Sequence, residues 1–142
     1  FKKLHPSGSL GAKLKTVEDI MLVGKKIPFV SDKMKMKKAI NILSEKKLGI
    51  LIVKNKENKT VGIITDGQIR RYNEKNSNLH VKKTKEIMTK KPVSVDKNIL
   101  AAKALSIMNT KKITSLCVHE KRNKNKTVGV LHIHNILRSN IS

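Results

Sequence analysis

Aromatic side chains are almost missing from this sequence of 142 residues, which has no tryptophan, one tyrosine and two phenylalanines. A hydrophobic core must therefore be built from Ile, Leu, Val, Met and Ala. The hydrophobic content of 38% is enough for such a core and argues against global disorder. Nucleic-acid-binding proteins often stack bases on aromatic side chains, and this sequence has too few of them for such a surface. The length suits one ordinary domain or two small ones that share a core.

Cysteine and acidic residues are also scarce. The single cysteine, Cys117, excludes an internal disulfide and lies in an apolar run, so we expect a buried thiol. Ten acidic residues leave little material for paired-carboxylate chemistry. No Gly-rich phosphate loop, nucleophile elbow or zinc-ligand spacing is present, so we expect no cofactor and no metal site.

Long apolar runs are absent as well, because no stretch approaches the roughly 20 residues of a membrane helix. We expect neither a membrane span nor a signal peptide, and a cytoplasmic location. The sequence begins at Phe1 rather than Met, so we expect a piece of a longer chain.

Basic residues dominate the composition, with 32 Lys and Arg and a formal net charge of +22. Binding to a nucleic acid or an acidic membrane is one interpretation of this charge. Only four of the basic residues are arginines, and the lysines are spread along the chain. A solvated lysine surface is therefore favoured over a nucleic-acid interface. The charge should still attract anionic ligands to any cleft.

An internal repeat organises the chain. Residues 17–21 resemble 84–88, and residues 59–64 resemble 126–131 at the same spacing. Between these pairs, apolar residues recur at helical spacing in both halves: Met36, Ala39, Ile40 and Leu43, then Ala101, Ala104, Leu105 and Met108. One supersecondary unit therefore occurs twice. We place a tail at 1–16, repeat 1 at 17–76, a linker at 77–83 and repeat 2 at 84–142.

Each repeat is predicted to contain a helical turn, an extended segment, a helix, two strands and a final helix. The extended segments are 27–30 and 92–95, the helices 34–47, 66–75, 98–111 and 133–139, and the strands 48–54, 61–65, 113–119 and 128–132. Asp96 is the expected N-cap of the helix at 98–111. The polar loop between the strands, from His119 to Lys126 in repeat 2, favours antiparallel pairs. The fold class is α/β (α+β): two βαββα repeats packed through their small sheets with pseudo-two-fold symmetry, leaving clefts for a small ligand.

The segments 62–71 and 129–138 carry a family resemblance. In each, a glycine-containing strand runs into a helix start, with Thr65 and Gln68 in the first segment and His132 and Asn135 in the second. These helix starts look like the Thr-x-x-Asp start of a known family signature. This order of elements, occurring twice, resembles a CBS-domain pair (Bateman module). The resemblance implies a regulatory, ligand-binding module that is not itself an enzyme, and further association into a homodimer.

The first eleven residues, FKKLHPSGSLG, carry a narrower resemblance. They are similar to the end of the catalytic sugar isomerase (SIS) domain of bacterial D-arabinose-5-phosphate isomerases, which carry a CBS pair after it. His5 matches a histidine of that catalytic domain. The resemblance implies a parent enzyme that interconverts D-ribulose 5-phosphate and D-arabinose 5-phosphate in the lipopolysaccharide (Kdo) precursor pathway, with the SIS domain as partner of the module.

The resemblance also implies a set of ligand-binding residues at the cleft: Thr65, Asp66, Gln68, Arg71, Thr114, Ser115, His132 and Asn135. Thr65 would present its hydroxyl to a phosphate, although Thr65 to Gln68 also fits a helix capping box. His132, in a His-x-His pair without further metal ligands, would cap a helix or add positive charge toward a phosphate near neutral pH.

Gln68 and Asn135 stand where many CBS domains place an aspartate that accepts hydrogen bonds from a ribose diol. An amide has only one acceptor group, which weakens the case for tight AMP or ATP binding. An AMP- or ATP-like nucleotide, a CMP-sugar-like metabolite, and a ligand-free structural or dimerisation module all stay open. A charge-driven nucleic-acid binder is the remaining alternative.

Overall fold

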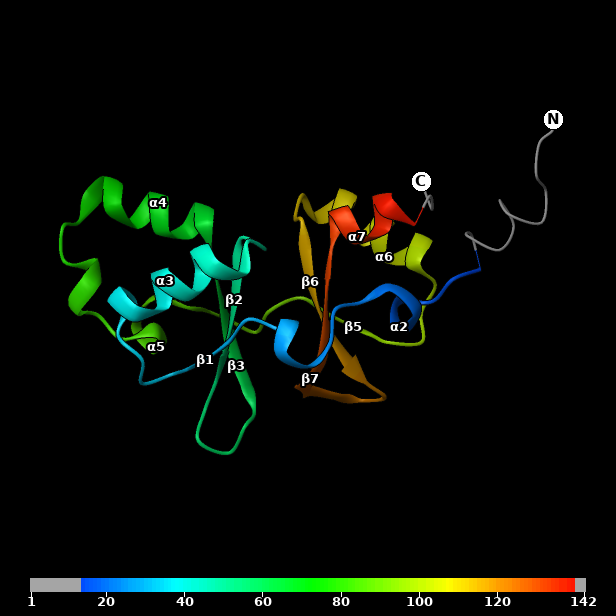
Figure 1. Cartoon of the computed structure of the whole chain (residues 1–142), viewed down its shortest axis with the longest axis horizontal. Helices are drawn as coiled ribbons and strands as arrows, with labels where there is room; N and C mark the ends of the chain where they lie inside the picture. Colours follow the sequence, from blue (N-terminus) through cyan, green and yellow to red (C-terminus); the bar gives the residue numbers. More distant parts are fainter. Residues whose placement is uncertain (1–13, 140–142) are drawn as a thin grey trace. The chain divides into compact units, whose positions relative to one another are not determined.

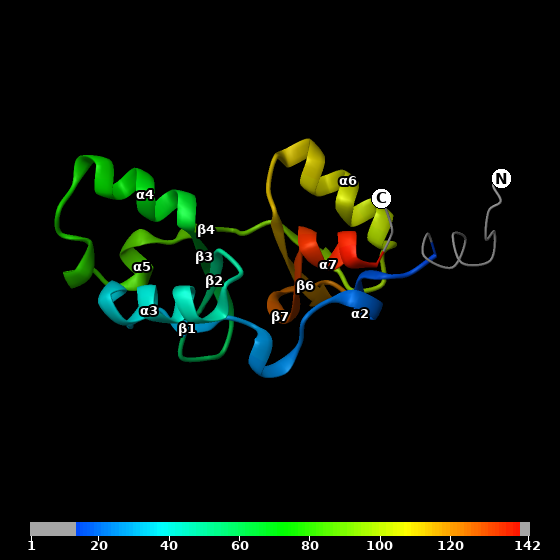
Figure 2. The same cartoon turned by 45° about the horizontal axis from the view of Figure 1, so that its top comes forward.

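The computed structural model describes residues 14–139, and in it the chain divides into two compact units. Within the described residues, unit 1 consists of 14–24 and 93–139, and unit 2 of 25–92. Each unit contains one small sheet with helices packed on it (Figures 1 and 2). His5 and most of the predicted tail lie outside the described residues.

Unit 2 is built on a four-stranded sheet in the order β1-β2-β3-β4. Its elements are the 3-10 turn η1 (Gly24–Lys26), β1 (Phe29–Ser31), α3 (Met36–Lys46), β2 (Ile50–Lys54), β3 (Thr60–Thr65), α4 (Asp66–Lys75), the 3-10 turn η2 (Leu79–Val81), α5 (Thr84–Ile87) and β4 (Thr89–Lys90). β1 and β2 are parallel because α3 connects them, and β2 and β3 are antiparallel. The antiparallel pair was predicted and is confirmed, whereas β4 was not predicted.

The core of unit 2 lies between α3 and the sheet. α3 buries the face that carries Met36, Ala39 and Leu43, the positions whose spacing predicted the helix. The central strand β2 is buried on both faces. Leu79, inside the predicted linker, is only 2% exposed and belongs to the same core. A single apolar residue in a polar segment shows no periodic pattern, so its burial could not be predicted.

Unit 1 is built on a three-stranded sheet in the order β5-β6-β7. Its elements are α2 (Val17–Ile20), β5 (Ser94–Asp96), α6 (Ala101–Lys111), β6 (Ser115–Glu120), β7 (Asn123–His132) and α7 (Ile133–Arg138). β5 pairs parallel to β6, and β6 pairs antiparallel to β7. The predicted mixed α/β fold with two small sheets is therefore confirmed.

Two details of repeat 2 differ from the prediction. β7 begins at Asn123, so most of the predicted polar loop is part of a longer hairpin. Asp96 is not the N-cap of α6, which begins at Ala101 after Leu100. Asp96 instead ends β5, paired with His119, and its carboxylate accepts a hydrogen bond from the Asn98 N–H at 2.8 Å. The pairing with His119 keeps Asp96 in extended backbone at the end of β5, and four residues lie between it and the first residue of α6.

The short helix at the start of each sequence repeat belongs to the compact unit that contains most of the other repeat. α2, from the start of repeat 1, packs in unit 1, where the Val17 N–H donates to the Ile99 carbonyl at 2.9 Å. α5, from the start of repeat 2, packs in unit 2, where the Thr84 hydroxyl donates to the Ser31 carbonyl at 2.6 Å. The compact units therefore differ from the sequence repeats by this exchange, and the repeat boundaries themselves stay a prediction.

The exchanged segments explain why β3 and β7 each carry a glycine, at Gly62 and Gly129. A Cβ on Gly62 would lie 2.7 Å from both the Met88 Sδ and the Thr89 carbonyl oxygen. A Cβ on Gly129 would lie against the Met21 side chain and 3.1 Å from the Leu22 carbonyl oxygen. The methionine after each short helix thus crosses directly over a glycine, which leaves no room for a side chain at either position.

Candidate functional site

The first corner lies where β3 runs into α4. The Thr65 hydroxyl accepts a hydrogen bond from the Gln68 N–H at 3.2 Å, and the Thr65 N–H donates to the Gln68 side-chain oxygen at 3.4 Å. This reciprocal pair is the predicted capping box, which is confirmed. The Asp66 N–H donates to the Gly49 carbonyl at 3.1 Å and fixes the start of α4 against the beginning of β2.

The Gln68 side chain already forms two hydrogen bonds within unit 2. Its oxygen completes the capping box, and its amide nitrogen donates to the Ile87 carbonyl at 2.5 Å, which ties α4 to α5. These two hydrogen bonds leave one amide N–H and one lone pair of the amide oxygen for a ligand hydroxyl. The ligand role predicted for Gln68 stays a prediction, and the structure gives this residue a positioning role already.

Two guanidinium groups lie at the start of α4. A Cβ on Gly67 would be 3.1 Å from an Arg71 terminal nitrogen and 3.6 Å from one of Arg70. Both side chains therefore fold back along α4, as expected because helical side chains point toward the helix N-terminus. The N-terminal end of a helix also carries partial positive charge. The corner is consequently positive, although the exposed Asp66 contributes one carboxylate of the opposite sign.

The second corner, in unit 1, repeats this arrangement with different residues. β7 ends at His132, whose Nδ1 accepts a hydrogen bond from the His134 N–H at 3.1 Å. The His132 N–H donates to the Asn135 side-chain oxygen at 2.8 Å. The Ile133 N–H donates to the Thr114 carbonyl at 2.9 Å, as the Asp66 N–H does to Gly49 in unit 2. The predicted cap role of His132 is therefore confirmed.

The electrostatics of His132 differ from the prediction. Partial burial lowers the pKa of His132, and the neighbouring His134 and Arg138 lower that pKa further. The capping hydrogen bond also requires an unprotonated Nδ1, which a charged imidazole does not offer. The expectation that His132 adds positive charge near neutral pH is therefore wrong. The charge at this corner comes from Arg138 instead.

Ser115 stands out at the second corner. It pairs in register with His132 at the start of β6. Its hydroxyl oxygen is buried and, among the residues 14–139, it is the one buried side-chain polar atom without a hydrogen-bond partner. An unsatisfied buried hydroxyl costs about 1–3 kcal/mol. The neighbouring Thr114 is exposed.

The predicted site residues thus fall into two groups. Thr65, Asp66, Gln68 and Arg71 gather at the corner of unit 2, and Thr114, Ser115, His132 and Asn135 gather at the corner of unit 1. Arg70 is not in the predicted set, because only the structure shows its guanidinium beside that of Arg71.

A buried polar pair in unit 1 was not predicted. His119 is 5% exposed, and its Nδ1 lies 2.6 Å from the Ser94 hydroxyl across the parallel strands β5 and β6. Burial lowers the pKa of His119. The pair links the two strands through neutral groups. Cys117, beside it on β6, is buried as predicted, and burial raises its pKa to about 12, so its thiol is not a nucleophile near neutral pH.

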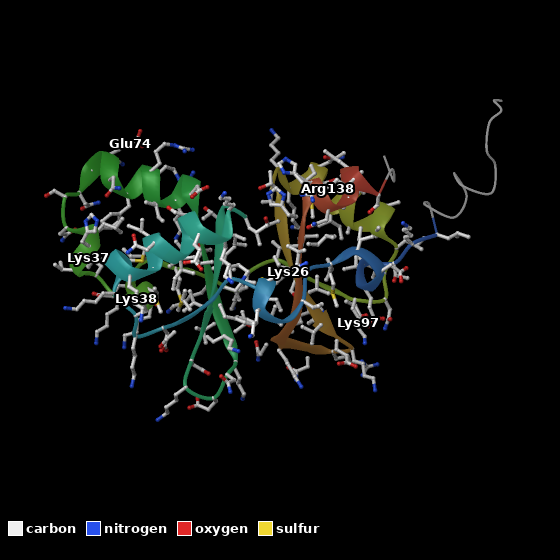
Figure 3. All side chains as sticks on the ribbon, in the orientation of Figure 1. Lys26, Lys37, Lys38, Glu74, Lys97 and Arg138 are labelled. Carbon is white, nitrogen blue, oxygen red and sulfur yellow. The ribbon has the colours of Figure 1, made fainter. Side chains whose placement is uncertain are left out.

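The lysines are spread over the surface of both units. Figure 3 labels basic side chains of both units, among them Lys37 and Lys38 on α3 in unit 2 and Lys97, which follows β5, in unit 1. Lys97 bridges Glu18 at 2.9 Å and Glu120 at 3.6 Å. Most other lysines of the described chain have no carboxylate partner, because there are so few acidic residues.

Between Leu14 and Ser139, no group of three or more His, Cys, Asp or Glu side chains is arranged to hold a metal ion. No helix of that same stretch is long and apolar enough to cross a membrane.

Comparison with known proteins identifies the repeats. The family model described as CBS domain matches residues 17–75 and 85–141. An uncharacterised protein of Rickettsia prowazekii is 37% identical over 142 residues, which cover 100% of this chain and 43% of the relative. An arabinose 5-phosphate isomerase of Yersinia pestis is 34% identical over 142 residues, which cover 99% of this chain and 42% of the relative. The chain spans less than half the length of these curated relatives.

Solved structures share the fold. The structure of CBSX2 in complex with AMP has a TM-score of 0.75 and 23% identity, covering 89% of this chain and 96% of that one. The CBS domain pair of protein MJ0100, in complex with 5′-methylthioadenosine and S-adenosyl-L-methionine, also has a TM-score of 0.75, with 22% identity, covering 88% and 94%.

Proposed function

The chain belongs to the CBS domain family, and on that premise we propose that it is a regulatory module that binds an adenine nucleotide, with the phosphate held at the Thr65 corner. The observation that carries this proposal is the approach of the Arg70 and Arg71 guanidinium groups to the start of α4. Arginine forks suit phosphate oxygens, and helix N-termini favour anions.

The choice of an adenine nucleotide draws on the two solved structures, whose ligands are AMP in one and adenosine compounds in the other. The engaged Gln68 amide argues that the ribose is held less firmly here than a carboxylate would hold it, since charge-assisted hydrogen bonds are the stronger ones. A CMP-linked sugar is the alternative ligand, and it would use the same phosphate corner.

Isothermal titration calorimetry at low salt with AMP, ATP, CMP and a CMP-linked sugar tests the proposal. Arg71→Gln should weaken AMP binding about tenfold, because it removes one charge-assisted contact to phosphate while the capping box stays intact. Arg122→Gln removes the same charge from the β6–β7 turn and is the matched control, expected to change affinity less than about twofold. Equal losses in both variants would contradict a phosphate at this corner, and failure of every ligand would favour a ligand-free structural module.

The module regulates a D-arabinose-5-phosphate isomerase in this proposal. Its support is the 34% identity to the Yersinia pestis enzyme and the likeness of residues 1–11 to the end of an isomerase domain. The chain should replace the matching part of that enzyme in a chimera. Saturating AMP should then change the rate of interconversion about fivefold, the scale of ordinary allosteric coupling. An unchanged rate, with AMP binding verified on the same chimera, would refute the regulatory link.

A further inference from the structure

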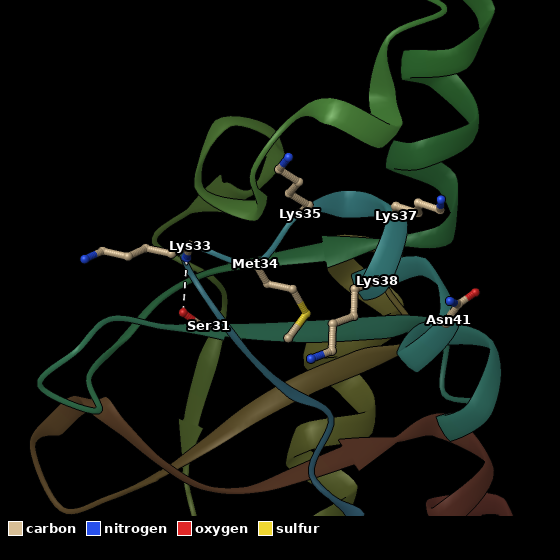
Figure 4. A pocket seen from close by; sticks show the side chains of 7 residues that line it. All are labelled: Ser31, Lys33, Met34, Lys35, Lys37, Lys38 and Asn41. Carbon is tan, nitrogen blue, oxygen red and sulfur yellow. Dashed lines mark hydrogen bonds between the residues drawn. The ribbon is translucent and has the colours of Figure 1, made fainter.

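A lysine-lined hollow opens on the surface of unit 2, at the turn between β1 and α3. It has a volume of about 650 Å³, and its lining includes Ser31, Met34 and four lysines: Lys33, Lys35, Lys37 and Lys38. Figure 4 shows the Met34 thioether in the middle of the hollow, with the side chain of Lys38 beside it and those of Lys33, Lys35 and Lys37 pointing in other directions.

The hollow is separate from the Thr65 corner. Ser31 pairs with Lys54 at the end of β2, whereas Thr65 pairs with Ile50 at its beginning. The five residues of β2 separate the two sites by about 13 Å at the usual rise of a strand. A ligand in the hollow would therefore leave the candidate site described above unoccupied.

The charge of the hollow is uncompensated. All four lining lysines are exposed, and none of their ammonium groups forms an ion pair or hydrogen bond with the described residues. The exchanged segment adds further lysines, because Lys35 and Lys83 form a backbone bridge beside the hollow.

The acidic groups near the hollow are few. Glu86 lies on the exchanged segment, where its carboxylate is 3.9 Å from the Lys82 ammonium and accepts a hydrogen bond from the Lys83 N–H. Asp32 is half-buried in the turn between β1 and α3. Two carboxylates do not balance the lysines gathered from both segments, so the surface keeps a strong positive charge.

The chemistry of the lining selects the kind of ligand. Ammonium groups are compact, mobile point charges, which suit several phosphate groups held close together rather than one planar carboxylate. The hollow offers neither an aromatic face for a base nor an arginine fork, and its volume lies in the range of small-molecule sites. We propose that the hollow is a second anion site, which binds the linked phosphates of a small polyphosphorylated molecule.

Inorganic tripolyphosphate is the probe for this site. Calorimetry on the 142-residue chain should show binding that weakens clearly between about 50 and 300 mM NaCl, since exposed charges are screened. Amide shifts in an NMR titration should concentrate between Ser31 and Asn41. The double variant Lys33→Gln, Lys38→Gln should weaken binding about tenfold. The matched control Lys124→Gln, Lys126→Gln loses the same charge from β7 and should change affinity less than about twofold.

Equal weakening in the two double variants, or shifts spread evenly over the chain, would overturn the site and leave only general attraction to a basic protein. The affinity for ATP, measured in the Arg71→Gln background, distinguishes a nucleotide from an inorganic phosphate chain as the ligand of the hollow. ATP and tripolyphosphate binding that are both lost with Lys33 and Lys38 support the site, with a nucleotide as one carrier. Loss of tripolyphosphate binding alone supports it for inorganic chains.

Discussion

Gly62→Ala should lower the free energy of unfolding by about 3 kcal/mol, the upper range for overpacking a filled core. The new methyl group would meet the Met88 Sδ and the Thr89 carbonyl oxygen, each at 2.7 Å. A methionine side chain can turn away, but the Thr89 carbonyl belongs to β4, whose pairing with β3 joins Gly62 to Lys90. The substitution must therefore separate β4 from β3 or shift the backbone of both.

Urea unfolding measures this change, and hydrogen exchange shows where it acts. Amides of β3, β4 and α5 should lose protection while those of unit 1 keep theirs. Gly129→Ala is the comparison, because most of its clash is with the flexible Met21 side chain. Met21→Ala should then reduce the cost of Gly129→Ala in a double-mutant cycle. A cost of Gly62→Ala below about 0.5 kcal/mol would show that the exchanged segment does not cross over this glycine.

Leu116→Ala should cost about 2–5 kcal/mol of unfolding free energy, the range for truncating a buried leucine. Leu116 is fully buried on the central strand β6, where it pairs with Leu131 and packs in the core formed by α6 and α7. A well-packed site on a central strand cannot collapse around the lost atoms, so a cavity remains.

Leu137→Ala is the matched control for Leu116→Ala, with the same change of side chain in the same unit. Leu137 is 49% exposed on α7, so its truncation should cost less than about 1 kcal/mol. Chemical denaturation of both variants gives the two values. Similar costs would contradict the placement of Leu116 in the core of unit 1.

The elements that were predicted correctly are those with a strong local signal. α4 was placed at its observed bounds because Thr65 and Gln68 form a capping box that is visible in the sequence. α3 and α6 followed from the helical spacing of Met36 and Ala101 with their partners. The antiparallel strand pairs followed from short polar loops between apolar runs.

Two features that were not predicted depend on contacts between distant parts of the chain. Asp96 has the chemistry of an N-cap, but its pairing with His119 decides its backbone position. The exchanged positions of α2 and α5 place Met21 against Gly129 and Met88 against Gly62, which are far apart in sequence. A helical turn of four residues carries no sequence pattern that predicts such a contact.

The two candidate sites were predictable to different degrees. The Thr65 corner was found through a motif, and the structure added the approach of Arg70 and Arg71. The lysine-lined hollow was missed because the alternation of lysine and methionine from Lys33 onward does not show which side chains surround a depression. Lysines are also abundant everywhere in this chain, so this group did not stand out in the sequence.

The binding of AMP at the Thr65 corner is the claim on which the proposed function depends. An NMR titration of the labelled chain with AMP tests it most directly, by following the amide signals of Thr65, Asp66, Gly67 and Arg71. We expect these signals to shift in a saturable way, with half-saturation at about tenfold higher AMP concentration in Arg71→Gln. Saturable shifts elsewhere that leave the four signals unmoved, or no shifts at millimolar AMP and low salt, would contradict it.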